Sequence, residues 1–224
     1  MRGIITGASR GLGLALTRAL SERGWHLAVD ARGAEALEHA VAGLAGVVGV
    51  SGDVTDADHR RRLVETAGEP IDLLVSNASL LGPSPLPLLA HYPLEELRSV
   101  YEANVFAPLA LVQLALPRFS PHARIVNLIS DAAVEAYETW GGYGSSKAAL
   151  AKISAVLGAE HPGLRVYAVD PGDMRTQMQQ DAFPGEDISD MPPPEQSVPG
   201  LMALIEGDLP SGLYRARDLV GASA

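Results

Sequence analysis

The stretch Gly3-Ile-Ile-Thr-Gly-Ala-Ser-Arg-Gly-Leu-Gly13 decides the fold, because a short apolar run changes there into a glycine-rich turn. Residues 14–20 then carry apolar side chains at helical spacing. Strand, glycine-rich turn and helix, in this order, form the context that a dinucleotide-binding site requires. The glycines let the backbone approach a pyrophosphate, and the N-terminus of the helix faces its charge. Taken alone, the motif is also compatible with a tight turn that binds no ligand.

Outward from this motif, strand-like apolar runs alternate with helical stretches along the chain. We expect strands at 3–6, 26–29, 47–51, 73–76, 124–128, 165–169 and 213–215, and helices at 12–23, 33–43, 56–67, 94–117, 143–159 and 196–206. This alternation predicts one α/β domain over residues 1–224, a doubly wound parallel sheet of about seven strands with helices on both faces. The segment 173–199 is rich in Pro, Met, Gln and acidic residues, so we expect a mobile loop that covers the functional site.

Composition excludes several classes of function. The 224 residues include no cysteine, which excludes disulfides and thiolate chemistry. The six histidines, at 26, 39, 59, 91, 122 and 161, lack metal-ligand spacing, so we expect no metal site and interpret them as structural or surface residues. A net charge of −10 argues against a nucleic-acid partner, and the basic run Arg60-Arg-Arg62 is interpreted as a solvated helical face. We expect no leader peptide, no apolar run of membrane-spanning length and a cytoplasmic location.

Tyr143 and Lys147 lie four residues apart in Trp140-Gly-Gly-Tyr-Gly-Ser-Ser-Lys147, and the Ala-rich continuation predicts a helix. Side chains at i and i+4 share one helical face, which places the ammonium near the phenol. At about 4 Å and an effective dielectric of about 20, this charge is worth roughly 4 kcal/mol, on the order of three pKa units toward the phenolate. The spacing therefore predicts that Lys147 brings the pKa of Tyr143 into the range of an acid catalyst, although any amphipathic helix carries the same spacing by chance.

With these elements placed, the chain resembles a short-chain dehydrogenase/reductase, an NAD(P)-dependent oxidoreductase on a single Rossmann domain. Residues 6–13, Thr-Gly-Ala-Ser-Arg-Gly-Leu-Gly, match T-G-x-x-x-G-x-G, and residues 171–176, Pro-Gly-Asp-Met-Arg-Thr, match P-G-x-x-x-T. Asp53-Val54 matches the pair that flanks the adenine, and Ser76-Asn-Ala-Ser79 stands where N-N-A-G is usual. The likeness is close over residues 3–176 and loose beyond them.

The resemblance also implies a catalytic set, which is Asn104, Ser130, Tyr143 and Lys147. Ser130 precedes Tyr143 by the thirteen residues usual in the family. In such enzymes the nicotinamide carries the hydride, while the protein supplies orientation, a proton and electrostatics. By this likeness Ser130 donates a hydrogen bond to the substrate oxygen, Tyr143 delivers the proton, and Lys147 also binds the nicotinamide ribose. Asn104 would hold a water that links Lys147 to solvent. The structural alternatives are that Ser130 ends a strand and that Asn104 satisfies a buried backbone group.

The same likeness implies a set of cofactor contacts: Gly7, Ser9, Arg10, Leu12, Gly13, Arg32, Asp53, Val54, Asn77, Ala78, Tyr143, Lys147, Pro171, Gly172, Met174 and Thr176. Ser79 departs from the family, because it adds a side chain where the backbone normally runs close to the cofactor. We expect this side chain to narrow the site.

Two rules disagree on which cofactor is bound. Asp30 lies about 20 residues beyond the glycine motif, where an acid that binds the ribose 2′-hydroxyl would indicate NAD. Counted from Gly24, however, the NAD-selective Asp of the family falls on Ala31, and alternation along the strand turns Asp30 the other way. Arg10 and Arg32 suit a 2′-phosphate, so we expect NADP(H), with NAD(H) as the alternative.

Candidate substrate contacts lie between Ser130 and Tyr143 and in the segment 173–199. Trp140, Met178 and Phe183 would line an apolar pocket, and packing within the loop is the equal alternative. Four acids in that segment argue against a polyanionic substrate such as an acyl-carrier-bound 3-oxoacyl group; they are Asp181, Glu186, Asp187 and Asp190. We expect a small or medium neutral ketone or aldehyde that is reduced to its alcohol, or the reverse oxidation.

Helix 94–117 is apolar on more than one face, so we expect at least a homodimer, with a tetramer as the alternative. Two functions from different classes fit the sequence. The first is an NADP-dependent carbonyl reductase or alcohol dehydrogenase. The second is a catalytically silent dinucleotide-binding protein with a regulatory or structural role. The complete catalytic set favours the enzyme, because a silent protein has no chemical reason to keep all its members.

Overall fold

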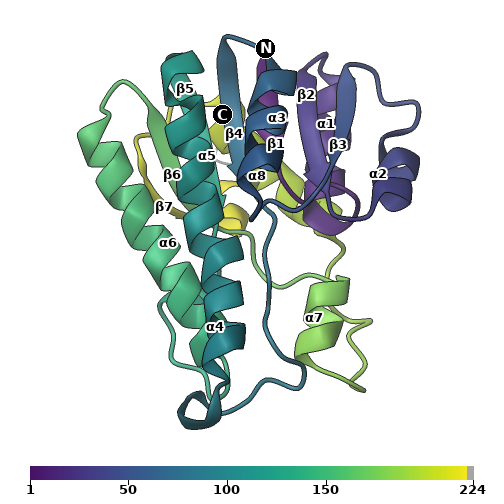
Figure 1. Ribbon diagram of the computed structural model, residues 1–224, viewed down its shortest axis with the longest axis vertical. Coiled ribbons are helices and arrows are strands. Elements are labelled where there is room, and N and C mark those ends of the chain that lie inside the picture. The colour runs from purple at the N-terminus through teal and green to yellow at the C-terminus, as the bar shows by residue number, and fades with distance from the viewer. Residues whose placement is uncertain (221–224) are drawn as a thin grey trace.

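The computed structural model describes residues 1–220, and its centre is a seven-stranded sheet (Figure 1). The strands are β1 (Arg2–Ile5), β2 (His26–Ala31), β3 (Val47–Ser51), β4 (Ile71–Ser76), β5 (Phe119–Leu128), β6 (Arg165–Asp170) and β7 (Gly212–Arg215). All neighbours pair in parallel, in the order β3-β2-β1-β4-β5-β6-β7. After β3 the chain crosses to the other side of β1, and ligands bind at such a switch point, outside the carboxyl ends of the strands.

Helices cover both faces of the sheet. They are α1 (Gly11–Glu22), α2 (Ala34–Val41), α3 (Ala57–Ala67), α4 (Leu94–Tyr101), α5 (Ala107–Ala115), α6 (Gly141–Glu160), α7 (Gln177–Ala182) and α8 (Val198–Glu206). Leu63 of α3 and Leu111 of α5 belong to the core on one face, on which α6 also packs. Leu16 of α1, Leu37 of α2 and Leu201 of α8 belong to the core on the other face.

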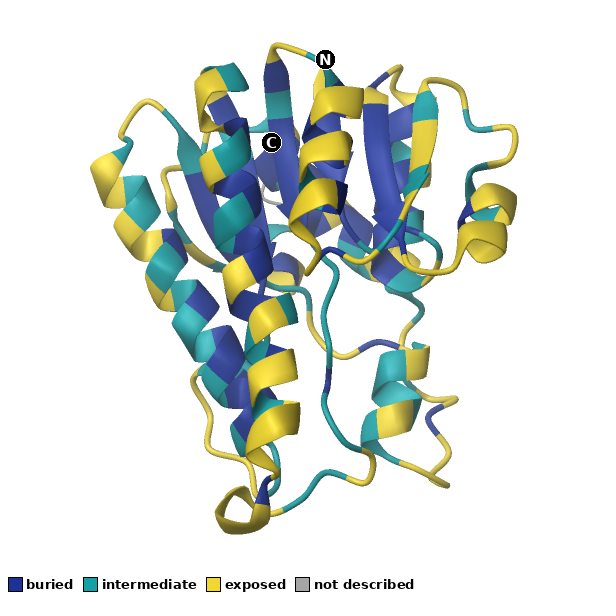
Figure 2. Ribbon diagram, viewed as in Figure 1, coloured by how far each residue is buried: buried dark blue, intermediate teal, exposed yellow. Residues whose placement is uncertain are grey.

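Strand β2 shows how one strand serves both cores. Ala28 lies in the core under α3 and α5, whereas Leu27 and Val29 lie in the core under α1 and α8. Successive side chains of a strand point to opposite faces, so a strand buried on both sides must be apolar at nearly every position. The centre of the sheet is accordingly buried, and exposed residues lie on the outer sides of the helices (Figure 2).

The predicted fold class is confirmed, and each predicted strand and helix overlaps an observed one. Strand β5 is longer than expected, because it begins at Phe119 rather than at residue 124. Phe119 already pairs with Ile71 of β4, and the register shifts before Leu73 pairs with Arg124. Pro121 and His122 interrupt the apolar pattern in this part of β5, so its sequence did not indicate a strand.

The helix predicted at 94–117 is interrupted in the middle. Between α4 and α5 lies a π-helical turn, Glu102–Phe106, which contains Asn104, and α5 ends in a 3-10 turn, Leu116–Arg118. A π turn inserts an extra residue into a helix and is often found at functional sites. Periodicity did not reveal it, because one inserted residue barely changes the apolar pattern.

This helical stretch, with its π turn included, corrects the expectation that the chain has no apolar run of membrane-spanning length. Leu94–Arg118 spans 25 residues with a mean hydropathy of 1.3, which is long and apolar enough to cross a membrane. In the fold, however, Leu111, Val112 and Ala115 are buried in the core against the sheet. Packing within the protein therefore accounts for the buried part of this stretch, which is 44% of its most apolar window.

The segment 173–199 contains more regular structure than the sequence indicated. Helix α7 begins after Thr176, whose hydroxyl accepts a hydrogen bond from the backbone amide of Gln179 at 3.3 Å. A 3-10 turn follows at Pro194–Ser197. In Figure 1, α7 stands apart from the helices that cover the sheet. At six residues, α7 is too short to produce a recognisable helical period.

Candidate active site

A cleft of about 1320 Å³ opens at the carboxyl ends of the strands. Residues that follow β1, β2, β3, β4, β5 and β6 line it, together with part of the segment 173–199. Pockets for one small molecule usually measure about 300–1,000 Å³. This cleft therefore has room for an extended ligand, such as a dinucleotide, together with a second molecule.

The glycine-rich turn after β1 forms the floor at one end of the cleft. Gly7 has a φ of +70°, and a Cβ there would lie 2.9 Å from the Cα of Ala78. The side-chain amide of Asn77 fixes the turn from the next strand, because its Nδ2 donates to the carbonyls of Thr6 at 2.8 Å and Gly7 at 3.0 Å. Helix α1 starts behind the turn with no acidic residue in its first turn. This backbone cradle fits a pyrophosphate.

Gly13, predicted to contact the cofactor, does not line the cleft. It lies in α1, where an added Cβ would meet the carbonyl oxygen of Gly7 and would lie 2.5 Å from Nδ2 of Asn77. Gly13 is needed because the helix packs tightly against the turn, so its effect on a ligand is indirect. The sequence pattern did not distinguish contact with a ligand from this close packing.

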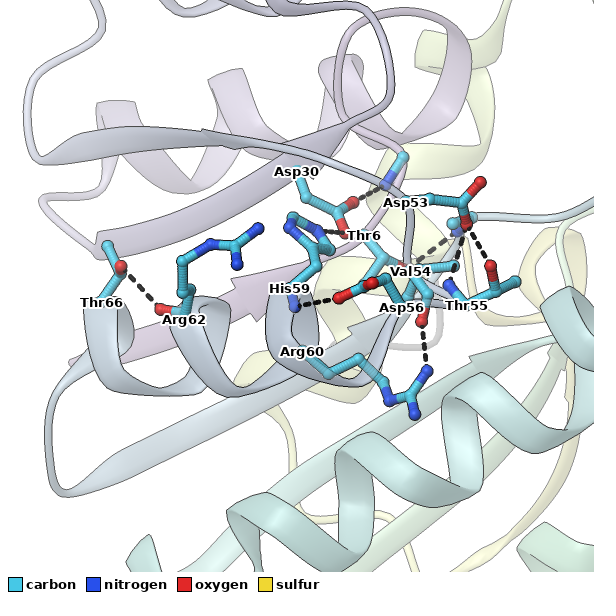
Figure 3. Close-up of polar contacts among 12 residues, drawn as sticks. Thr6, Asp30, Asp53, Val54, Thr55, Asp56, His59, Arg60, Arg62 and Thr66 are labelled. Atoms are coloured by element: carbon cyan, nitrogen blue, oxygen red, sulfur yellow. Dashed lines mark hydrogen bonds and ion pairs between the residues drawn. The ribbon is translucent and has the colours of Figure 1, made fainter.

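Asp30 is buried, with 2% of its surface exposed, and does not reach outward from the end of β2. Its Oδ1 accepts a hydrogen bond from the backbone amide of Gly7 at 2.7 Å, and its Oδ2 lies 3.0 Å from Nε2 of His59. Figure 3 shows Asp30 and His59 facing each other between β2 and α3. The carboxylate is thus engaged with the glycine-rich turn. No sequence pattern indicated that His59 joins this contact, because the two residues come together only in the folded chain.

Two cations and one acid stand at the outer rim of this end. Arg10 and Arg32 are exposed, and within residues 1–220 neither side chain has a hydrogen bond or an ion pair. The carboxylate of Asp53 accepts hydrogen bonds from the amide and hydroxyl of Thr55, both at 2.8 Å. Partial burial alone would raise the pKa of Asp53, but these hydrogen bonds and the charge of Arg32 lower it. Asp53 therefore stays ionised beside Arg32.

The basic run Arg60-Arg-Arg62 was interpreted as a solvated helical face, and this is wrong for Arg60. The guanidinium of Arg60 donates to the carbonyl of Val54 at 2.8 Å and so holds the backbone after β3 (Figure 3). Arg61 and Arg62 are exposed, as expected. Arg60 thereby supports Val54, one of the residues expected to flank the adenine.

Tyr143 and Lys147 meet in the middle of the cleft, on the first half of α6. Both are buried, with 8% and 3% of their surfaces exposed, and Nζ of Lys147 lies 5.4 Å from the centre of the Tyr143 ring. The ammonium donates to the carbonyl of Leu128 at 2.8 Å. Burial lowers the pKa of Lys147 to about 7. The helix thus brings the two residues onto one face, as their spacing predicted.

The expected effect of Lys147 on the pKa of Tyr143 is wrong for this structure. Burial raises the pKa of Tyr143, the Ser79 hydroxyl beside it acts in the opposite direction, and the charges of Asp170 and Asp131 raise it further. Lys147 does not offset this rise, because burial lowers its own pKa to about 7 and its side chain is neutral at the pH where the phenol would ionise. Tyr143 therefore keeps its proton at neutral pH.

Ser130 follows β5 and faces the same cleft. Its hydroxyl donates to Oδ1 of Asp131 at 2.9 Å and accepts from the backbone amide of Ala132 at 3.2 Å. The other carboxylate oxygen of Asp131 accepts from the hydroxyl of Tyr137 at 2.9 Å. Asp131 belongs to the stretch between Ser130 and Tyr143 that was expected to contact the substrate, but the sequence did not show that it binds Ser130.

Asn104 lies behind the wall of the cleft and is fully buried. Its Nδ2 donates to the carbonyl of Leu80 at 2.9 Å and to the hydroxyl of Ser146 at 3.0 Å. Its Oδ1 accepts from the amide of Leu80 at 2.7 Å and the hydroxyl of Ser79 at 3.1 Å. These four bonds use the whole amide group. Asn104 thus ties the π turn to the loop after β4 and to α6.

The far end of the cleft is aromatic and apolar. The ring of Trp140 lies 5.9 Å from that of Tyr143 and 5.9 Å from that of Phe183, measured between ring centres. Met178 of α7 packs against the same cluster. The three residues predicted for the substrate pocket are therefore brought together beside Tyr143, and all three line the cleft.

Most other predicted contacts also lie on the cleft surface: Ser9, Leu12, Val54, Ala78, Pro171, Gly172, Met174 and Thr176. Sequence reasoning missed several further lining residues, which are Arg18, Leu81, Gln177, Gln179, Met191 and Glu195. Only the distribution of Met and acidic residues in the segment 173–199 pointed toward part of this set. Within the described part of the chain, no group of three or more His, Asp or Glu side chains is arranged to hold a metal ion.

Comparison with known proteins agrees with this geometry. Residues 3–187 match the family described as short chain dehydrogenase. The chain is 34% identical over 191 residues to 1-deoxy-11-beta-hydroxypentalenate dehydrogenase of Streptomyces arenae, covering 78% of this chain and 67% of that protein. It is 32% identical over 193 residues to an (S)-benzoin-forming benzil reductase of Saccharomyces cerevisiae, covering 80% and 73%.

Solved structures give the same result. A short chain dehydrogenase from Escherichia coli in complex with NADPH superimposes with a TM-score of 0.87, at 26% identity over 96% of this chain and 95% of that one. A short chain dehydrogenase from Pseudomonas syringae gives a TM-score of 0.86, at 28% identity over 96% and 93%. Fold, cleft and relatives agree, and the chain belongs to the short-chain dehydrogenase family of oxidoreductases.

Proposed function

We propose that this enzyme uses NADPH to reduce a small or medium ketone or aldehyde to an alcohol, or catalyses the reverse oxidation. The observation that carries the proposal is the convergence of Ser130, Tyr143 and Lys147 on one cleft with the glycine-rich turn. Several relatives bear names of the same reaction class, among them a benzil reductase and a serine 3-dehydrogenase of Agrobacterium fabrum.

The glycine-rich turn, Arg10, Arg32 and the loop at 171–176 would hold the dinucleotide, whose nicotinamide supplies the hydride. Ser130 and Tyr143 orient the substrate oxygen, and Tyr143 gives its phenolic proton to that oxygen. Because burial raises the pKa of Tyr143, its phenol carries at neutral pH the proton that reduction consumes. Oxidation requires the phenolate and is therefore favoured at higher pH.

Lys147 contributes its positive charge and a hydrogen-bond donor for the nicotinamide ribose. Its pKa of about 7 means that the ammonium is half deprotonated near neutrality before a ligand binds. An anionic dinucleotide would favour the charged form. All donors and acceptors of the Asn104 side chain are already in hydrogen bonds, so this side chain cannot hold the water expected between Lys147 and solvent. We propose that the backbone carbonyl of Asn104 binds that water instead.

NADPH is proposed over NADH for two reasons. Arg10 and Arg32 stand exposed at the rim with no partner within the described residues, ready to pair with a dianionic phosphate. Asp30, the residue that would otherwise bind a ribose 2′-hydroxyl, already bonds to Gly7 and His59. NAD(H) is the alternative, and it would require Asp30 to leave both partners.

The enzyme is further proposed to be a cytoplasmic homodimer, with a tetramer as the alternative. Phe106 at the start of α5 and Val156 on α6 are 52% and 43% exposed. Pairing of α5 and α6 across a two-fold axis would bury both. Light scattering at micromolar concentration tests this arrangement: a dimer is expected, and a monomer contradicts it.

The experiment that tests the function is NADPH oxidation with a panel of aryl ketones, diketones and aldehydes, with the alcohol product identified by mass spectrometry. Turnover of at least one class is expected. The competing function, a silent dinucleotide-binding protein, predicts NADPH binding with no turnover of any panel member. Titration of NADPH and NADH in the same assay tests the cofactor choice.

A further inference from the structure

Asp131 places an uncompensated negative charge in the wall of the cleft. Its carboxylate accepts hydrogen bonds from the hydroxyls of Ser130 and Tyr137 and from the amide of Ala132, at 2.8–2.9 Å. All three donors are neutral. Among residues 1–220, no Lys, Arg or His side chain forms an ion pair with Asp131. The full charge is therefore available to a ligand in the cleft that Asp131 lines.

The two ends of the cleft also differ in their balance of charges. Arg10, Arg18 and Arg32 line the nucleotide end. Of the acids at that end, Asp30 contacts His59, which leaves Asp53. Asp131, Asp170 and Asp173 line the substrate end. Two cations also line the cleft, but each donates a hydrogen bond to a backbone carbonyl and neither forms an ion pair with these acids. Lys147 donates to Leu128, and Arg175 donates to Ser189. Asp131 and Asp170 lie close enough to raise the pKa of Tyr143. The substrate oxygen would thus be held where the surroundings are acidic.

Asp131 is also within reach of a group next to the reacting carbonyl. A substrate oxygen bonded to Ser130 would lie about 2.8 Å from Oγ of Ser130. Oδ1 of Asp131 lies 2.9 Å from the same Oγ. Because both oxygens contact the same Oγ, a substituent on the carbon beside the carbonyl comes within reach of the Asp131 carboxylate.

The hydrogen bond between Ser130 and Asp131 also favours a substrate with a cationic substituent at this position. Its hydroxyl proton is donated to Asp131, so it is turned away from a carbonyl oxygen that needs a donor. A cationic group that binds Asp131 would replace Ser130 as its donor. Ser130 could then donate to the substrate oxygen. Recognition of the substituent and activation of the carbonyl would be coupled.

We propose that Asp131 is a specificity-determining residue, and that the preferred substrate is a ketone or aldehyde with an ammonium group on the carbon next to the carbonyl. The product would be a vicinal amino alcohol. This inference rests on the proposed function, and it replaces the neutral ketone or aldehyde expected from the sequence with a cationic one. The aromatic wall accommodates the remainder of the substrate.

Four phenyl ketones that differ in one group provide the test: 2-amino-1-phenylethanone, 2-hydroxy-1-phenylethanone, propiophenone and benzoylformate. Reduction by NADPH is measured at mildly acidic pH, where the amine is charged. We expect kcat/KM for the amino ketone to exceed that for propiophenone by about tenfold or more, with benzoylformate last. Asp131→Asn keeps an oxygen acceptor for Ser130 but removes the charge, so it should abolish this ratio, mainly through KM.

Asp173→Asn is the matched control, because it removes one negative charge from the same cleft and should keep the ratio. The proposal is overturned if the unmodified enzyme prefers propiophenone or benzoylformate, if Asp131→Asn keeps the preference, or if Asp173→Asn loses it equally. Absence of turnover both with these four ketones and with the wider panel of aryl ketones, diketones and aldehydes contradicts the proposed function instead. In that case calorimetry measures the Kd of the amino ketone and of propiophenone for the NADP⁺ complex of the unmodified enzyme and of Asp131→Asn. The inference predicts that the unmodified enzyme binds the amino ketone about tenfold or more tightly than propiophenone and that Asp131→Asn does not, and any other outcome overturns it.

Discussion

The two ends of the cleft are built from different parts of the chain. At the nucleotide end the backbone forms the surface: Gly7 adopts a positive φ, and the side-chain amide of Asn77 donates to the carbonyls of Thr6 and Gly7 where the turn begins. At the substrate end, side chains form the surface, with Trp140 packed on Phe183 beside α7. A backbone cradle requires glycines at fixed spacing, whereas a side-chain wall depends on which way each residue turns. The dinucleotide-binding end can therefore be predicted from the spacing of glycines in the sequence. The choice of substrate depends on side-chain positions that only the folded structure shows.

The largest effect is expected where the two ends meet. Tyr143→Phe removes the phenolic proton and little else, so it should lower kcat for ketone reduction by about 10²–10⁴-fold and leave the Kd of NADPH within about twofold. Steady-state kinetics and calorimetry measure the two effects. Tyr214→Phe is the control, because its hydroxyl bonds only to the carbonyl of Pro210, far from the cleft. Near-normal kcat in Tyr143→Phe would show that Tyr143 is not the proton donor.

At the nucleotide end, Gly13→Ala should separate backbone packing from ligand contact. The added Cβ has no room between α1 and the turn, so we expect destabilisation of about 1–3 kcal/mol together with weaker NADPH binding. Urea unfolding and NADPH titration measure both. Gly163→Ala, where a Cβ meets open space, should change neither. Unchanged stability and affinity in Gly13→Ala would show that the turn is not held by this contact.

The pH dependence tests Lys147, which the two ends share. Burial places the pKa of Lys147 at about 7, so its ammonium is present below that pH and lost above it. Since Tyr143 stays protonated in this range, kcat/KM for NADPH should fall as pH rises through about 7, with a limiting slope of about tenfold per pH unit.

The same fall is expected with NADH, which excludes titration of the 2′-phosphate as its cause. In Lys147→Arg the charge persists at every pH in this range, so the fall should disappear even where the rate is lower. A profile unchanged by this substitution would assign the titration to another group.

The smallest expected effects concern the rim of the nucleotide end. Arg32→Ala and Arg10→Ala should each reduce the preference for NADPH over NADH by about three- to thirtyfold, because each removes one charge-assisted contact to the 2′-phosphate. Arg62→Ala, on the exposed side of α3, is the control and should have no effect. Tighter binding of NADH than NADPH by the unmodified enzyme would show that Asp30 binds the ribose.

The features predicted correctly from sequence depend on neighbours along the chain. The strands, the glycine-rich turn and the shared face of Tyr143 and Lys147 follow from local periodicity. The π turn around Asn104 escaped detection because one extra residue hardly alters that periodicity. The pairing of Asp30 with His59 joins residues 29 positions apart and arises only when α3 packs beside β2.

The pKa of Tyr143 was predicted in the wrong direction for a related reason. Spacing places Lys147 on the same helical face but does not show that its ammonium bonds to Leu128. Nor does it show that the phenol is buried near Asp131 and Asp170, which both raise its pKa. The reactivity of a side chain is set by its whole surroundings, and those come from several elements distant in sequence.

The central claim, hydride transfer to a carbonyl with Tyr143 as proton donor, is tested most directly by isotope transfer. NADPH that carries deuterium at both hydrogen positions of C4 of the nicotinamide is incubated with the best ketone of the panel, and the alcohol is analysed by mass spectrometry. The account predicts one deuterium on the carbinol carbon for each NADPH consumed, and almost no labelled alcohol from Tyr143→Phe. NADPH consumption without deuterium in the product, or equal labelling by the Tyr143→Phe variant, would contradict it.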